Sequence, residues 1–214
     1  MNLSLNEVEN LVRKAARGAG LDPGRADDLA AASAVLASHG LPVCAIMYRA
    51  LTGSPGQPLT IAADGAQAIC PATSAARMGS SALDLLLAKP AGFEVTLDAL
   101  DEPLLIAALA VVAARRYASG FAVTAQHATL TIERDRRTDF AALENARCIP
   151  IVLRRLDATA ARPSRTMTPA SRYDPEQVSD DGVAGLERRA RMTYGPASDA
   201  SRLKGAGAGL TDND

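Results

Sequence analysis

Three places in this sequence carry side chains of the types that do chemistry, and Cys70 is the first. Cys70 precedes Pro71, an order that could place the thiol at a helix N-terminus with proline in the first helical position. That setting lowers the pKa of a thiol and makes it a nucleophile. Alternatively, Cys70 is a small buried hydrophobic residue, since free cysteine is among the most buried residue types.

His39 and Arg77 are the other two candidates. His39 ends a predicted helix in the sequence Ser38-His39-Gly40, where an imidazole suits the helix dipole. Arg77 lies between Ser74 and Ser80, just before an expected helix over 81–89. Backbone N–H groups, hydroxyls and a guanidinium could together bind a carboxylate or phosphate there. The alternative is an ordinary helix cap beside a surface arginine.

The metal-ligating residue types are too scattered to predict a metal site. The chain has 2 His, and neither has a Cys or carboxylate at ligand spacing. Asp212, Asn213 and Asp214 could offer oxygen ligands, but a lone cluster rarely organises a cation without further carboxylates. We therefore expect no metal and no cofactor.

The final residues alternate glycine with alanine and end on an acidic cluster. Glycine this dense does not order itself as helix or strand. A dinucleotide-binding loop would need a strand before it, a helix after it and an acidic residue about twenty positions on; only residues 210–214 follow. The tail is therefore a frayed end or a peptide that inserts into a groove of a neighbouring subunit or partner. The expected docking residues are Arg202, Gly205, Gly207, Gly209, Asp212 and Asp214.

Composition bounds the class of protein. With 214 residues, of which 48% are hydrophobic, the chain can bury a core. Lys and Arg number 23 against 24 Asp and Glu, so there is no basic footprint for nucleic acid. The 3 Cys fit a reducing compartment better than a disulfide framework. The opening has no signal-peptide pattern, and the longest apolar run, 103–114, is too short to span a bilayer. We expect a cytoplasmic protein that binds neither nucleic acid nor membrane.

Caps and periodicity predict an N-terminal three-helix unit over 1–53. Ser4 and Glu7 form a capping box for the first helix. Asp22-Pro23 starts the second helix, and Leu41-Pro42 the third.

The following part, 54–156, is expected to contain the sheet. Residues 54–70 are expected to form a loop with one short strand. The further expected elements are a helix over 81–89, a strand over 93–97, a helix over 103–120, paired strands over 121–124 and 129–132, a short helix over 138–146 and a strand over 148–156.

This order predicts an α+β fold, with a mixed or antiparallel sheet and packed helices. The globular domain would cover 1–156. Residues 157–214 would form an extended arm, a short helix over 183–192 and the Gly/Ala tail.

Both ends of the chain resemble a bacterial family known only as a domain of unknown function. The resemblance rests on residues 4–9, 13–20 and Cys70-Pro71, and near the other end on 193–197, 201–202 and 205–214. It implies that the tail belongs to the protein, and it implies no activity. Ser38-His39-Gly40 is also similar to the helix-ending motif of the malate/L-lactate dehydrogenase family, although that family's cofactor-binding body has no visible counterpart here.

The sequence leaves two alternative functions open. The first is an oligomeric or accessory subunit whose arm and tail dock on a neighbouring subunit, identical or not. The second is a small-molecule enzyme with Cys70 as nucleophile, or with an anion pocket around Arg77 and His39. Both hold if one subunit's tail closes another's pocket.

Overall fold

The computed structural model describes residues 3–193 except Ser54, Asp64, Ala72, His127 and the segment 157–179. The predicted arm over 157–179 lies outside the described residues. So do the predicted docking residues of the tail, Arg202, Gly205, Gly207, Gly209, Asp212 and Asp214.

The three N-terminal helices are α1 (Leu5–Gly18), α2 (Pro23–Ser38) and α3 (Val43–Thr52). Ser4 caps α1 through a capping box, in which its backbone N–H donates to Glu7 Oε2 at 2.7 Å and Glu7 N–H donates to Ser4 Oγ at 3.3 Å. Asp22 caps α2 by accepting from Arg25 N–H at 3.0 Å. The predicted three-helix unit is confirmed.

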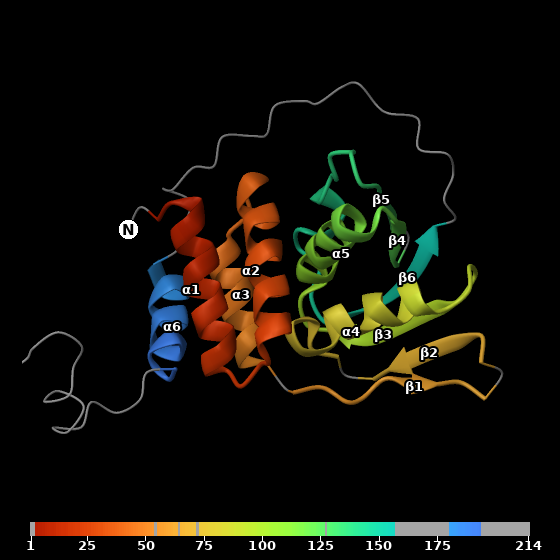
Figure 1. Ribbon diagram of the computed structural model, residues 1–214, viewed down its shortest axis with the longest axis horizontal. Coiled ribbons are helices and arrows are strands. Elements are labelled where there is room, and N and C mark those ends of the chain that lie inside the picture. The colour runs from red at the N-terminus through yellow and green to blue at the C-terminus, as the bar shows by residue number, and fades with distance from the viewer. Residues whose placement is uncertain are drawn as a thin grey trace, which may run out of the picture.

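A fourth helix, α6 (Asp180–Arg191), packs on α1 and α3 (Figure 1). It was expected to begin at residue 183. Glycines permit the close approach: a Cβ on Gly182 would lie 2.6 Å from Ala45 N, and one on Gly185 would lie 2.4 Å from the Tyr48 ring. The helix expected within the arm thus packs on the N-terminal helices of its own chain.

The described strands form one six-stranded sheet in the order β1-β2-β3-β6-β4-β5. Their bounds are β1 Thr60–Ile61, β2 Gln67–Cys70, β3 Glu94–Leu100, β4 Gly120–Ala125, β5 Ala128–Ile132 and β6 Ile149–Leu156. β2 and β3 pair in parallel and are connected through α4 (Ala75–Ala88), while the other neighbours are antiparallel. The α+β fold with a mixed sheet is therefore confirmed.

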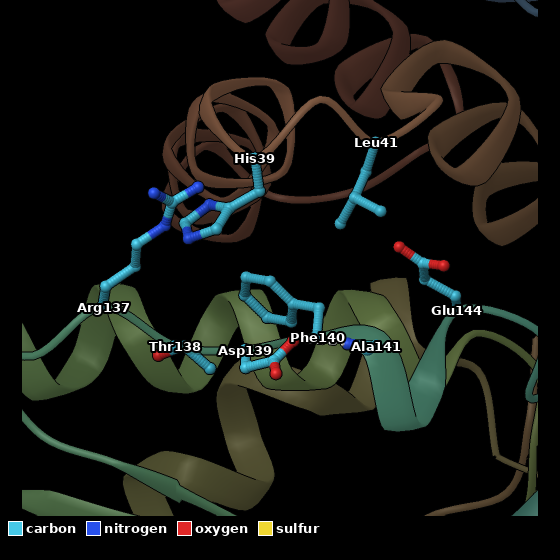
Figure 2. Close-up of a pocket in the computed structure, with 8 residues that line it drawn as sticks. All are labelled: His39, Leu41, Arg137, Thr138, Asp139, Phe140, Ala141 and Glu144. Atoms are coloured by element: carbon cyan, nitrogen blue, oxygen red, sulfur yellow. Dashed lines mark hydrogen bonds between the residues drawn. The ribbon is translucent and has the colours of Figure 1, made fainter. Parts of the chain in front are cut away.

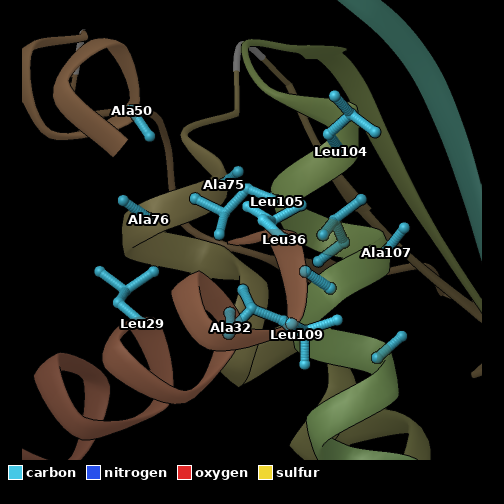
Figure 3. Close-up of a cluster of buried hydrophobic side chains, with 14 of the residues drawn as sticks. Leu29, Ala32, Leu36, Ala50, Ala75, Ala76, Leu104, Leu105, Ala107 and Leu109 are labelled. Carbon is cyan, nitrogen blue, oxygen red and sulfur yellow. The ribbon is translucent and has the colours of Figure 1, made fainter. Parts of the chain in front are cut away.

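The core lies between the sheet and the helices. α4 and α5 (Pro103–Tyr117) lie against the sheet, and α2 packs on both from the other side. Side chains such as Leu36, Leu105 and Leu109 meet at this junction (Figure 3). α5 is therefore buried on nearly every side, which explains its uninterrupted apolar sequence.

Three further predicted elements differ from the structure. The helix expected at Ser81 begins at Ala75, because Gly79 does not interrupt it but lets α5 approach: a Cβ there would lie 2.6 Å from Leu109 Cδ1. The short helix expected over 138–146 is only a 3₁₀ turn, Ala141–Leu143. The segment expected to be loop contains β2 as well as β1, since pairing with β3 stabilises a strand that has little local signal.

Candidate functional site

A cavity of about 330 Å³ lies between the end of α2 and the segment that carries the 3₁₀ turn. His39 and Leu41 contribute one wall, and residues 137–141 with Glu144 contribute the other (Figure 2). The helix that ends at Ser38 and the 3₁₀ turn at Ala141–Leu143 therefore position the site.

The hydrogen bonds of His39 define its tautomer. Nδ1 lies 2.8 Å from the carbonyl oxygen of Val35. A carbonyl only accepts, so Nδ1 carries a proton and donates it. In the neutral ring Nε2 then keeps a lone pair. Nε2 is buried and has no hydrogen-bond partner among the described residues.

Two neighbours confine the imidazole. The Phe140 ring meets it edge to face, with centroids 4.8 Å apart and planes at 90°. The exposed Arg137 side chain extends over the cavity toward the imidazole (Figure 2).

Thr138 supplies a second unpartnered group. It is 4% exposed, and its Oγ1 is buried with no hydrogen-bond partner in the described part of the chain. Buried polar atoms without partners are few in native proteins, because each costs about 1–3 kcal/mol. Two of them, His39 Nε2 and Thr138 Oγ1, belong to residues lining one cavity.

The charged residues of the cavity have different roles. Asp139 Oδ1 accepts from Ala141 N–H at 3.0 Å and so caps the 3₁₀ turn. Arg137 has no ion pair with any described residue, so its guanidinium is the positive group of the lining, and Glu144 adds a second carboxylate.

The predicted anion pocket does not form as a unit around Arg77. Because α4 begins at Ala75, Arg77 lies within the first turn, where its Nη2 donates to Ala19 O at 3.2 Å. Ser74 is the buried N-cap residue, and Ser80 lines a small cleft beside Asp28. Among described residues, none of these three lines the His39 cavity, and their anion-binding role stays a prediction.

The expected setting of Cys70 is wrong. Cys70 ends β2 and is followed by an exposed Pro71, and the next helix begins only at Ala75. The thiol is therefore not at a helix N-terminus. It is fully buried and donates to the carbonyl oxygen of Gln57 at 2.8 Å. This arrangement fits the alternative, a small core residue.

The sequence interpretation missed Arg137 and Thr138. Their only local signal is a polar run immediately before the buried Phe140, and of that run only Thr138 and Asp139 fall within the helix expected over 138–146. Only the packing of this segment against the end of α2 brings them to His39.

The described residues contain no cluster of three or more His, Cys, Asp or Glu side chains able to hold a metal ion. None of their helices combines the length and apolar content needed to cross a membrane.

The fold and the cavity define an α+β protein with a pocket, lined by His39, between the end of α2 and the segment of the 3₁₀ turn. Residues 3–80 match the model of a family described as "Protein of unknown function (DUF3726)". The match includes His39, Cys70 and Arg77, and it confirms the resemblance to a family of unknown function over those residues. No curated protein matches the chain.

Proposed function

We propose that this protein binds a small anionic metabolite carrying a hydroxyl group in the His39 cavity. The observation that supports it is the pair of unpartnered buried atoms, His39 Nε2 and Thr138 Oγ1, on residues that line one cavity. A ligand able to donate and accept hydrogen bonds would remove both desolvation costs at once.

The chemistry of the wall defines the ligand class. With Nδ1 donating to Val35, the Nε2 lone pair can accept a hydrogen bond from a hydroxyl group. The Thr138 hydroxyl both donates and accepts. Arg137 supplies the charge for a carboxylate. A hydroxycarboxylate meets all three requirements.

The same geometry suits proton transfer. An imidazole held through Nδ1 by a carbonyl oxygen presents Nε2 as a general base toward a bound hydroxyl. This links the cavity to the metabolic-enzyme alternative drawn from the sequence, with His39 rather than Cys70 as the reactive group.

Histidine NMR tests the proposal directly, because the chain has 2 His. His127→Gln assigns the ring signals of His39. Lactate should shift the ¹⁵N resonance of His39 Nε2, and propionate, which lacks the hydroxyl, should bind about tenfold or more weakly. Thr138→Val and Arg137→Gln should weaken lactate binding, while Arg136→Gln, a neighbouring exposed arginine, should not. Equal binding of lactate and propionate, or no effect of Thr138→Val, contradicts the proposal.

A second candidate is an oligomeric or accessory subunit whose C-terminal segment docks on a neighbouring subunit. The observation favouring it is the close packing of α6 on α1 and α3, which places the last described residue, Thr193, next to the helical layer. Sedimentation equilibrium of the full chain should reveal self-association, and ending the chain after Thr193 should weaken it. Every described element remains in that shorter chain. A full chain that is monomeric at all concentrations contradicts this candidate.

A further inference from the structure

A second hollow, of about 580 Å³, runs between α1, α2 and the end of α5. Its floor is made of small and apolar side chains, Ala31, Ala34 and Val112. Its rim carries Arg13, Arg115 and Arg116. We call these six residues the arginine groove.

One cation of the arginine groove is not neutralised. Arg13 Nε lies 2.8 Å from Asp27 Oδ1, and Arg116 Nη1 lies 2.7 Å from Asp28 Oδ1. Arg115 is exposed, and its guanidinium has neither an ion pair nor a hydrogen bond with any described residue.

The carboxylates at the groove match its arginines in number but leave Arg115 without an ion pair. Glu9 and Asp27 line the groove and Asp28 pairs with Arg116, so three arginines less three carboxylates give a net charge of 0. An occupant of this groove should therefore combine small or aliphatic side chains with a negative charge placed at Arg115.

We propose that residues 210–214 of this chain occupy the arginine groove. Leu210 provides one aliphatic side chain for the alanine floor, and Asp212 and Asp214 provide the charge that complements Arg115. The preceding Gly/Ala repeat, 205–209, adds little bulk that would obstruct entry. This inference rests on the second candidate function, the docking of the C-terminal segment. It does not require that a ligand binds in the His39 cavity.

Chain length allows this docking. From Thr193, at the end of the described helical layer, 17 residues lead to Leu210 (210 − 193) and span at most about 61 Å. The 14 residues of α1, on which both α6 and the groove lie, extend about 21 Å. The segment can thus reach the groove of its own chain or of a second copy.

Occupation of the groove would contact the turn that holds His39. Val35 and Ser38 line the arginine groove on one side of α2. The carbonyl oxygen of Val35 accepts from both Ser38 Oγ and His39 Nδ1, each at 2.8 Å. The two hollows therefore share the last turn of α2.

A nitroxide label on the full chain tests the inference. Cys44 and Cys70 are buried, so Cys148→Ser removes the exposed thiol and Asn213→Cys places the label between the two aspartates. The amide NMR signals of Ala31, Ala34 and Val112 should lose intensity, while those of Thr60 and Ile61 on β1, which does not pack on α1, α2 or α5, should not. Arg115→Glu should abolish the loss, and adding Asp212→Arg and Asp214→Arg should restore it. Arg136→Glu, outside the groove, serves as the matched control.

The outcomes separate the groove from the function on which it rests. Intensity loss on another surface, or a pattern unchanged by Arg115→Glu, overturns the groove and leaves docking intact. No loss anywhere overturns both. A sample mixing isotope-labelled chains with separate nitroxide-labelled chains detects docking between copies. If NMR intensity is lost only when the nitroxide and the isotopes are on the same chain, the result supports the groove but contradicts docking on a neighbouring subunit.

Discussion

Arg49 and Glu102 form an ion pair in which the carboxylate is buried and the guanidinium is partly exposed to solvent. The Glu102 side chain is 2% exposed, whereas that of Arg49 is 43% exposed. Arg49 donates through Nε to Oε1 and through Nη2 to Oε2, the latter at 3.3 Å. Arg147 approaches from a third segment, with Nε 3.4 Å from Glu102 Oε1. The buried carboxylate thus joins α3, the start of α5 and the segment before β6.

Arg49→Gln should lower the free energy of unfolding by about 2–3 kcal/mol. Removing one partner of a buried ion pair costs about 3–5 kcal/mol because the other charge stays desolvated, and Arg147 offsets part of this cost here. Urea unfolding measures the difference. Arg154→Gln is the control, because its partner Glu94 is 33% exposed, and it should cost under about 1 kcal/mol. Equal costs for the two variants would show that burial of Glu102 does not matter.

Asp101 should make the protein less stable as the pH rises. Its Oδ1 accepts from Ala75 N–H at 2.8 Å and from Glu102 N–H at 2.7 Å, while Oδ2 is buried without a partner among the described residues. Burial raises the pKa of Asp101 above its ordinary 3.8, and the two backbone hydrogen bonds oppose this. The folded state therefore binds the proton more tightly than the unfolded state. The stability this provides is complete below the unfolded pKa and is lost as the pH rises through the folded pKa.

Asp101→Asn isolates that contribution. The amide oxygen can accept the same two backbone hydrogen bonds and carries no charge. Relative to the original chain, the variant should become more stable as the pH rises from about 4 to 7. Urea unfolding at a series of pH values gives the comparison. A variant that loses more than about 1 kcal/mol at pH 7 would show that the ionised carboxylate itself is needed.

Features with a local cause were predictable from the sequence, and those made by distant contacts were not. The capping box at Ser4 and the start of α2 at Asp22 depend on residues three positions apart. The strand β2 and the early start of α4 depend instead on β3 and on the close approach of α5. His39 was identified because it ends a helix, but Thr138 joins it only through packing across about a hundred positions of sequence.

Thiol labelling should separate Cys148 from the other two cysteines. Cys148 is exposed, whereas Cys44 and Cys70 are buried. Burial raises the pKa of Cys44 to about 11, so little thiolate forms there at neutral pH. A disulfide reagent at pH 7.5 should modify one thiol rapidly, and Cys148→Ser should remove that phase. A rapid phase that persists in Cys148→Ser and disappears in Cys70→Ser would instead restore Cys70 as a reactive residue.

Gly182→Ala and Gly24→Ala are the same substitution near the start of two helices, and they should have opposite effects. On Gly182 a Cβ would lie 2.6 Å from the backbone N of Ala45, so α6 must move away from α3. On Gly24 the nearest atom, Asp22 Oδ1, would be 3.4 Å away, an ordinary contact. Gly182→Ala should therefore destabilise the protein by about 1–3 kcal/mol, and Gly24→Ala should stabilise α2 by up to about 1 kcal/mol. Hydrogen exchange should also speed up over α6 in Gly182→Ala alone. If that variant keeps its stability and its slow exchange, α6 is not packed on α3 at this distance.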